Sequence, residues 1–216
     1  MIQKMLRTIT AQYHLNAITL GEFQKMKVNG MNFDIWAFHA EGLGHVSAMS
    51  AKGFFGLMKM DTLIINPTEK DMPMLSYDRV YALGNDTLIY ELYDTFLEKT
   101  ALNRLEEVKT KHRQLPDHDL GAHWYDSLKL PVSLAKKGKQ GSSGDFDGCA
   151  IAYLEAFLAH AAEAEYCDPA GKKEKASVYV EGLLSNGGPS TDVFKKGLGP
   201  EKTGQLFRNI LFGTSR

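Results

Sequence analysis

The spacing of apolar residues changes along the chain, from helical at the start to alternating further on. Residues 1–23 have apolar positions that recur at helical spacing, which predicts an amphipathic helix. Polar and apolar residues then alternate through 33–42, which predicts a strand, and 45–49 is expected to be its hairpin partner. The pattern therefore predicts one helix followed by a hairpin.

Three further strands are expected in the first half. They lie at 57–65, 77–83 and 87–93, and the first is closed by Asn66-Pro67. Gly84-Asn85-Asp86, between the last two, is typical of a turn. Because short links join successive strands, they favour an antiparallel meander.

The second half is mostly helical. Helices are expected at about 102–108, 150–165, 177–184 and 200–212, with Pro200 suited to the first turn of the last one. A run of strands followed by a run of helices predicts an α/β or α+β layered fold with one central antiparallel sheet. We expect a single domain over residues 1–216.

Three segments of the second half lack helical spacing. Residues 112–123 are polar and rich in histidine, and 124–134 are predicted as an aromatic-led strand or turn. Residues 136–147 are basic and then rich in glycine and serine, which predicts a mobile loop.

Composition and charge are those of an ordinary globular protein. Hydrophobic residues make up 44% of the 216, and 25 Lys and Arg nearly balance 26 Asp and Glu, which argues against nucleic acid as a partner. The chain has no apolar run of about 18 residues and no signal-peptide core, so we expect a cytoplasmic protein without a membrane partner. Cys149 and Cys167 are expected on one helix, about 27 Å apart, as reduced thiols.

Common motifs for cofactors and nucleophiles are absent. Residues 197–204 resemble a phosphate loop but lack the glycine before the lysine and do not follow a strand. There is no dinucleotide fingerprint, nucleophile elbow or Cys-x-x-Cys pair. His112, His118 and His123 match no defined metal site, so the prediction is a hydrogen-bonded loop and no metal.

One segment carries more specific chemistry. The strand that ends at Pro67 is followed by a short loop to Pro73, and Asp78 lies five residues further on, inside an otherwise apolar strand. A buried carboxylate must be hydrogen-bonded, paired or protonated, and such a group can be a general acid with a raised pKa. Alternatively, Asp78 pairs with Arg79 or caps a turn.

The order of several motifs resembles the ferredoxin-dependent bilin reductases, a superfamily that includes red chlorophyll catabolite reductase. Asp71-x-Pro73 and Asp78 are similar to the family's Asp-x-Pro and following acid. Weaker similarities, in the same order as in the family, are Gly84-Asn85, Glu91-Leu92-Tyr93-Asp94, Leu115-Pro116, Trp124-Tyr125-Asp126-Ser127, Pro189, Gly199 and Leu211-Phe212. They extend in patches from about residue 33 to 212.

The resemblance implies a three-layer α/β/α sandwich with a linear tetrapyrrole, such as biliverdin, between the sheet and the C-terminal helices. It also implies no bound cofactor, since reduced ferredoxin supplies single electrons and the protein supplies protons. Asp78 would be the proton donor. The expected substrate-binding residues are Asn66, Arg79, Trp124, Ser127 and Arg208, with Lys59 as a further candidate for the propionates.

Two departures from the family pattern leave an alternative open. A histidine that assists the acid in some members would fall near Asp61-Thr62, and a C-terminal acid would fall at Gly188, with Glu174 nearby in sequence. Asp78 would then be the only family acid left. The alternatives are a tetrapyrrole-binding or carrier protein without chemistry, or an unrelated interaction domain.

Three lysine clusters are candidate docking sites for an acidic electron carrier such as ferredoxin. They are Lys136, Lys137 and Lys139; Lys172, Lys173 and Lys175; and Lys195, Lys196 and Lys202. The favoured alternative for each cluster is a solvated face that confers solubility.

Overall fold

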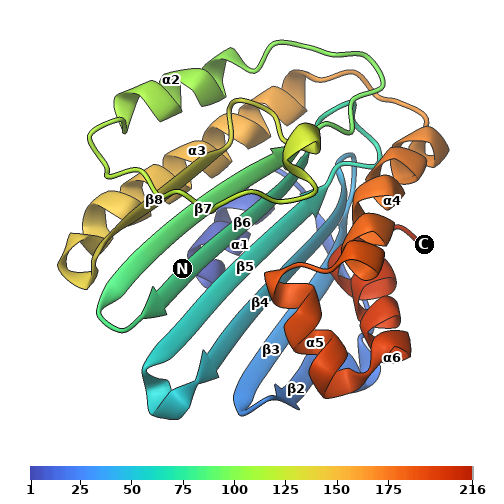
Figure 1. Cartoon of the computed structure of the whole chain (residues 1–216). Helices are drawn as coiled ribbons and strands as arrows, with labels where there is room; N and C mark the ends of the chain where they lie inside the picture. Colours follow the sequence, from blue (N-terminus) through green and yellow to red (C-terminus); the bar gives the residue numbers. More distant parts are fainter. Residues whose placement is uncertain (216) are drawn as a thin grey trace.

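One antiparallel sheet of eight strands runs through the middle of the molecule (Figure 1). The computed structural model describes residues 1–215, except for the side chains of residues 142 and 143. The strands are β1 (Leu15–Ala17), β2 (Lys25–Val28), β3 (Met31–Ala40), β4 (Gly44–Gly53), β5 (Met58–Asn66), β6 (Met74–Ala82), β7 (Asn85–Tyr93) and β8 (Leu134–Lys139). Their order is β1-β3-β4-β5-β6-β7-β8, and β2 also pairs with β3. The predicted antiparallel meander is confirmed from β3 to β7.

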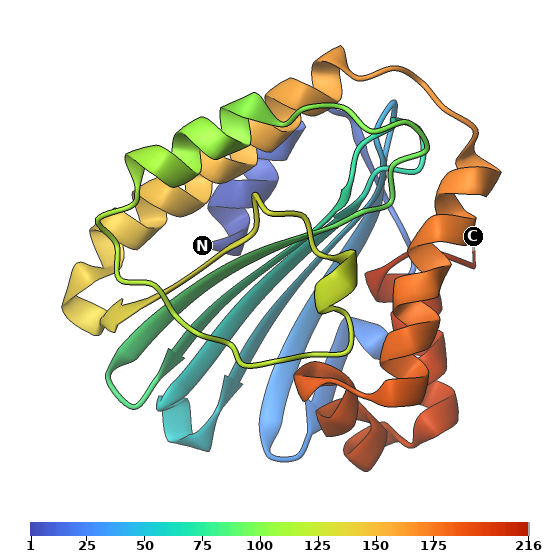
Figure 2. The ribbon, with the colours of Figure 1, turned by 45° about the horizontal axis from the view of Figure 1, so that its top comes forward.

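Helices cover both faces of this sheet (Figure 2). One face packs against α1 (Ile2–Thr10), α2 (Asn103–Lys111) and α3 (Ser143–Glu163). The other packs against α4 (Pro169–Asn186), α5 (Pro189–Leu198), α6 (Pro200–Gln205) and the π-helical segment η5 (Leu206–Leu211). Short 3-10 turns are η1 (Gly21–Gln24), η2 (Phe54–Gly56), η3 (Asp126–Leu128) and η4 (Gln140–Ser142). The predicted three-layer sandwich is confirmed.

Alternation along each strand assigns the side chains to these two layers. On β6, Tyr77 points toward α3 and is fully buried, whereas Asp78 points toward the C-terminal helices. Tyr90 on β7 stacks on Tyr153 of α3 with ring centroids 4.3 Å apart, and its hydroxyl donates to the carbonyl of Ala150 at 2.7 Å. The α3 face is therefore a closed core, and the other face is free to form a site.

Three side chains of the sheet attach the C-terminal segment. The Nε2–H of His45 donates to the carbonyl of Ile210 at 2.8 Å, and Ser47 Oγ donates to that of Leu211 at 2.7 Å. Asn66 Nδ2 donates to the carbonyl of Phe212 at 2.8 Å. Carbonyls at the end of a helix have no partner within it, so these bonds satisfy three of them and fix η5 on β4 and β5.

The structure corrects several boundaries. The first helix ends at Thr10, and two short edge strands, β1 and β2, occupy residues that alternate too briefly to be recognised. The helix expected at 177–184 begins at Pro169, where the Asp168 side chain accepts from the amides of Ala170 and Gly171. The helix expected at 200–212 is divided into α6 and η5.

The segment expected to be a mobile loop is ordered. Residues 134–139 form β8, and α3 begins at Ser143. Lys136 of β8 is buried. Its ammonium donates to Asp117 at 2.6 Å and to the carbonyl of Leu115 at 3.0 Å, which compensates for the loss of water. Basic composition therefore misled the prediction, since one of the lysines is a structural residue.

The two cysteines are both free but do not share a helix. Cys149 is buried in α3, and Cys167 lies beyond the end of that helix at Glu163. Among the described residues, no helix combines the length and apolar character needed to cross a bilayer. The cytoplasmic location stays a prediction.

Asn66→Ala is expected to lower the free energy of unfolding by about 1 to 3 kcal/mol, because the buried carbonyl of Phe212 loses its donor. Urea unfolding followed by circular dichroism measures this change. Asn16→Ala, which removes an exposed hydrogen bond to Glu41, is the control and is expected to change stability by less than about 0.5 kcal/mol. Equal effects of the two substitutions would contradict the attachment described above.

Candidate functional site

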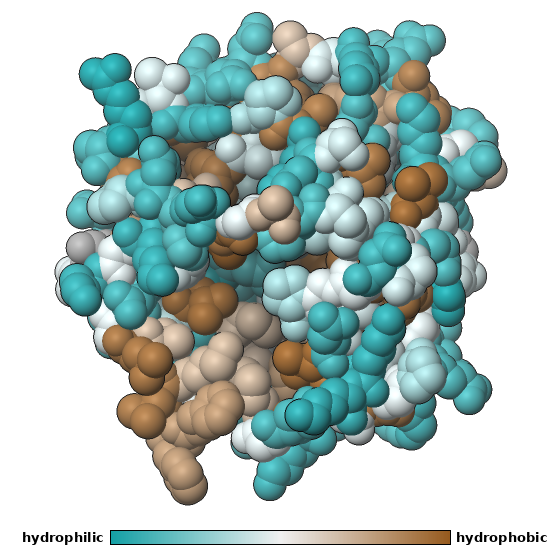
Figure 3. All heavy atoms as spheres, in the orientation of Figure 1, coloured by the Kyte–Doolittle hydropathy of each residue, from teal (hydrophilic) through white to brown (hydrophobic). Residues whose placement is uncertain are grey.

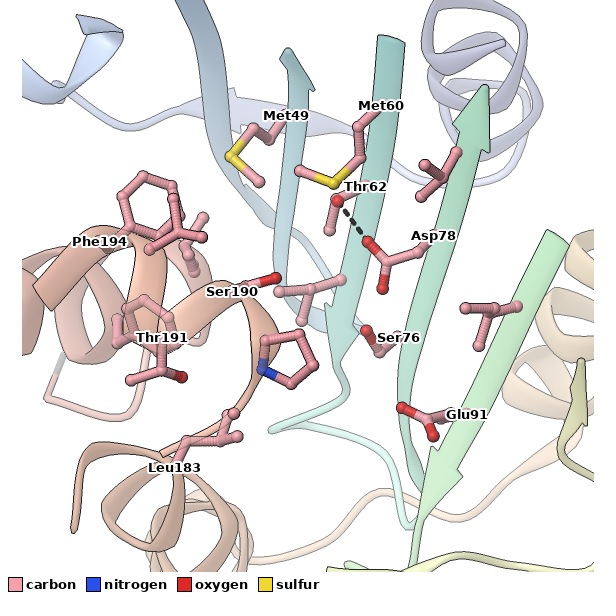
Figure 4. Close-up of a pocket in the computed structure, with 18 of the residues that line it drawn as sticks. Met49, Met60, Thr62, Ser76, Asp78, Glu91, Leu183, Ser190, Thr191 and Phe194 are labelled. Atoms are coloured by element: carbon pink, nitrogen blue, oxygen red, sulfur yellow. Dashed lines mark hydrogen bonds between the residues drawn. The ribbon is translucent and has the colours of Figure 1, made fainter. Parts of the chain in front are cut away.

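A cavity of about 380 Å³ lies between the sheet and the C-terminal helices, which is within the usual range for small-molecule sites. Its sheet side is mostly apolar, with four methionines, and its other side comes from α4, α5, η5 and the 112–133 segment. Figure 4 shows Thr62, Ser76, Asp78 and Glu91 pointing from the strands toward Ser190, Thr191 and Phe194 of α5. The cavity therefore has an apolar lining and a small polar group at one place.

Asp78 is at the centre of that polar group. Thr62 lies directly opposite it on β5, and the Thr62 hydroxyl donates to Asp78 Oδ1 at 2.5 Å. Burial raises the pKa of the Asp78 carboxyl to about 6, the negative charge of Glu91 adds to the rise, and the Thr62 hydrogen bond opposes it. A carboxyl with this pKa is partly protonated near neutral pH and can donate a proton.

Glu91 is a second carboxylate in the cavity. Glu91 is on β7, opposite Ser76 of β6. It accepts from the Tyr93 hydroxyl at 2.6 Å and from Lys129 Nζ at 3.3 Å. Lys129 also pairs with Asp126 at 2.7 Å, and Asp126 is exposed to solvent. A chain of polar contacts therefore runs from the cavity to the surface.

Glu91 was missed as a site residue, although it falls within a motif used for the family resemblance. The signal that could have found it is the strand period, which puts Ile89 and Glu91 on the same face as Ser76 and Asp78 once β6 and β7 are paired. Asp78 is thus not the only carboxylate in the cavity.

Aromatic rings form the wall next to Glu91. Tyr179 of α4 stacks on Tyr93 with centroids 3.8 Å apart, and its hydroxyl donates to that of Tyr93 at 2.7 Å. Tyr125 and His123 stack on each other with centroids 4.9 Å apart, and both line the cavity. Of the three histidines in the 112–123 segment, His123 alone lines the cavity, and Leu120 of the same segment lines it too. The described residues contain no cluster of metal-binding side chains.

Arg79, predicted to bind substrate, lies on the opposite face of the sheet. Its side chain is fully buried, donates to both carboxylate oxygens of Asp86, and contacts Asp147 at 3.2 Å. The guanidinium also lies 5.2 Å from the ring centroid of Phe146. Successive side chains in a strand point to opposite faces of the sheet, and Asp78 faces the cavity. Arg79 therefore points away from the cavity and stabilises the α3 side.

The other expected substrate-binding residues do not line the cavity either. Asn66 holds the carbonyl of Phe212, and Arg208 of η5 forms a two-contact ion pair with Glu181 of α4, at 2.6 and 2.7 Å. Ser127 is exposed in η3, and Lys59 is exposed on the α3 side of β5. Among the described residues that line the cavity there is no lysine or arginine.

Trp124 positions its neighbours in the cavity wall. Its indole N–H donates to the carbonyl of Gly187 at 3.0 Å, and the ring lies so close to Gly182 that an added Cβ would be 2.1 Å from it. Only glycine therefore fits at 182 with this ring position. The contact attaches the 112–133 segment to α4 and orients Tyr125 and His123.

The two departures from the family pattern are visible in the cavity. Thr62 takes the place near which a histidine was expected, and its hydroxyl contacts Asp78. Gly188 lines the cavity just before α5 and provides no carboxyl group. Glu174 is exposed on α4 and does not line the cavity, so it does not compensate for Gly188.

The three lysine clusters are partly structural. Lys172 is fully buried and donates to the carbonyls of Met72 and Thr95, both at 2.6 Å. Lys175 donates to the carbonyl of Phe96, and Lys202 pairs with Glu22 at 2.7 Å. With Lys136 also buried, the clusters present fewer free charges than the sequence indicates.

Sequence comparisons give no relative. A scan against models of known protein families finds no match, and a search of curated proteins finds none. Among solved structures, the chain is similar to selenomethionine phytochromobilin synthase from tomato in complex with biliverdin, with a TM-score of 0.80 and 14% sequence identity. The match covers 99% of this chain and 82% of that one.

The chain has the fold of phytochromobilin synthase. The expectation of this fold is therefore confirmed, although it was based on short motifs with no diagnostic patch.

Asp78→Asn is expected to stabilise the protein at pH 8 by roughly 2 to 3 kcal/mol, and to have little effect at pH 4. The folded-state pKa of about 6 lies above the usual 3.8, so the contribution of Asp78 to stability is fully present below pH 4 and is lost as pH rises through 6. Asparagine has no such titration. Urea unfolding at both pH values measures the difference, and a stabilisation that is equal at both would contradict the raised pKa.

Glu91→Gln is expected to lower the pKa of Asp78 from about 6, because a negative charge that disfavours ionisation is removed. Carbon-13 NMR of the carboxyl groups during a pH titration measures the pKa. Asp34→Asn, at an exposed position of β3, is the control and is expected to leave the pKa of Asp78 unchanged. A pKa that does not move in Glu91→Gln would show that Glu91 and Asp78 are not coupled.

Proposed function

We propose that the chain binds a linear tetrapyrrole of the biliverdin type in this cavity and reduces it with single electrons from a reduced ferredoxin, with Asp78 as proton donor. The observation that supports this most is the position of Asp78, whose carboxyl has a pKa of about 6 inside a largely apolar cavity. The fold match supports the same substrate class, since the solved structure of the tomato enzyme contains biliverdin.

The lining suits a flat, mostly apolar ligand with central N–H groups. Methionines from β3, β4 and β5 and the rings of Phe194 and Phe207 offer apolar contact on both sides. Asp78 and Glu91 are acceptors for pyrrole N–H groups, and carboxylate acceptors give strong hydrogen bonds. Because the described lining lacks lysine and arginine, the acidic side chains of a bilin would point out of the cavity.

Reduction of one double bond requires two electrons and two protons. A ferredoxin delivers the electrons one at a time, so the substrate passes through a radical state, and no cofactor bound to the chain is required. Asp78 donates one proton and is recharged from solvent. The second proton comes from solvent along the polar contacts that link Glu91 through Lys129 and Asp126 to the surface.

A non-catalytic carrier on the same fold is the second candidate. Gly188 and Thr62 favour it, because the cavity has no carboxyl at the first position and no imidazole at the second. A carrier would bind the pigment through the same apolar lining but would not need a recharged proton donor.

Asp78→Asn is expected to keep binding biliverdin, since the amide carbonyl still accepts a hydrogen bond, but to reduce it at least about 100-fold more slowly, because the proton donor is removed. Binding is measured by the shift of the pigment's visible absorption, and turnover by anaerobic addition of reduced ferredoxin. Asp34→Asn, an exposed aspartate on β3, is the matched control and is expected to keep both activities.

The outcomes separate the candidates. Reduction at the wild-type rate in Asp78→Asn would show that Asp78 is not the donor. Pigment binding without reduction by the wild-type protein would favour the carrier, and failure to bind any bilin would reject both.

A further inference from the structure

Four large apolar side chains are exposed at one end of the sheet. Phe54, Phe55 and Leu57 are in the β4–β5 turn, and Leu83 is in the adjacent β6–β7 turn. Their exposed fractions are 61%, 108%, 68% and 86%. We call these four residues the apolar tip. Figure 3 shows brown and tan side chains gathered at the lower left of the molecule, where Figure 1 shows these turns.

The backbone of the apolar tip is unfavourable for these residues. Phe54, Phe55 and Leu83 have φ values of 50°, 55° and 49°, a region that large side chains rarely adopt. Hydrophobic residues on an exposed, strained turn contribute nothing to the core. Such a combination is typical of a surface that contacts another phase or molecule.

A row of lysines runs beside the apolar tip. Lys52 of β4 and Lys59 of β5 are exposed and lie directly opposite each other, and exposed Lys27 of β2 lies in the same row on the far side of Asn32 of β3. Like charges opposite each other in a sheet are destabilising. Among the described residues, none of the three lysines forms an ion pair.

The acids at this end of the sheet are already paired, so they do not neutralise the lysine row. Asp34 contacts Lys25, Asp61 contacts the N-terminal amine at 3.1 Å, and Asp86 is buried with Arg79. The row therefore presents net positive charge next to protruding apolar side chains.

We infer that the apolar tip and the lysine row form a docking surface for a lipid bilayer that contains anionic phospholipids. Protruding Phe and Leu side chains can insert among acyl chains, and lysines beside them attract anionic headgroups. The fully exposed Phe55 side chain fits a fluid phase, which needs no preformed complementary pocket. This revises the expectation of no membrane partner, which considered only spanning segments.

The apolar tip is continuous with the cavity, whereas the lysine row lies on the opposite face of the sheet. Met58 follows Leu57 directly and lines the cavity, as do Met31, Met49 and Met60. Apolar side chains thus extend from the apolar tip into the cavity, so a docked molecule would hold the cavity close to the bilayer. An apolar ligand could then pass between them without entering water. The docking itself does not depend on the proposed function.

The test is co-sedimentation with vesicles of phosphatidylcholine, with and without phosphatidylserine. The wild type is expected to bind the mixed vesicles at least about tenfold more tightly. Phe54→Ser/Phe55→Ser is expected to lose at least about tenfold on the mixed vesicles. Lys52→Gln/Lys59→Gln is expected to lose about fivefold for each lysine, on mixed vesicles only.

Matched controls separate this surface from the rest. Val178→Ser removes an exposed apolar side chain on α4, and Lys196→Gln removes an exposed lysine on α5. Both are expected to bind vesicles as the wild type does. Phe55→Trp provides an independent readout, since its fluorescence is expected to be quenched by brominated acyl chains.

Three results would overturn the inference. One is a wild type that binds neither vesicle. Another is a wild type that sediments as a dimer without vesicles while Phe54→Ser/Phe55→Ser is a monomer, which would make the surface an interface between copies. The third is binding of an acidic ferredoxin, lost in the same variant, without vesicle binding. Biliverdin titration without lipid tests the cavity separately.

Discussion

The hydrogen bonds that join the C-terminal segment to β4 and β5 hold the cavity together. One wall of the cavity is the sheet, and the other includes η5 and the helices before it. His45, Ser47 and Asn66 bind three consecutive carbonyls, so the distance between the walls is set at one end by polar contacts of fixed length. At the other end of the cavity, the contact of Trp124 with α4 sets the distance between the walls. Both attachments leave the interior apolar.

That apolar interior is what gives the two carboxyl groups their different behaviour. Asp78 has one hydrogen bond, from Thr62, and burial dominates its pKa. Glu91 has a tyrosine hydroxyl and an ammonium group as partners. Two acids in neighbouring strands therefore meet different surroundings, which is the usual basis for assigning an acid and a stabiliser of charge to different residues.

The sequence predicted the central sheet because β3 to β7 alternate clearly and are joined by short turns. It identified Asp78 as unusual because a carboxylate inside an apolar strand needs an explanation. It could not assign Arg79, because an adjacent residue in a strand faces the other way, and the sheet must be assembled before either face is known. The burial of Lys136 and Lys172 was not predicted for a related reason. A lysine can be buried only where carbonyls or carboxylates of distant segments accept from its ammonium group.

The exposure of Phe55 and Leu83 was likewise not predicted from the sequence. By composition they belong in a core, yet the turns that carry them extend beyond it. Glu91 was hidden because it follows Tyr90 and precedes Leu92, both buried, so its direction is visible only from the register with β6. Arg79 and Glu91 could thus not be assigned to a face before the strands were paired.

The attachment of the C-terminal segment also has a consequence for biosynthesis. Its three hydrogen bonds join residues 165, 164 and 146 positions apart, so the cavity face of the sheet stays uncovered until almost the whole chain has left the ribosome. Contacts of such separation form late. A nascent chain that lacks only α4 to η5 would carry a complete sheet with one apolar face open to water, and that intermediate is the one that chaperones would have to protect.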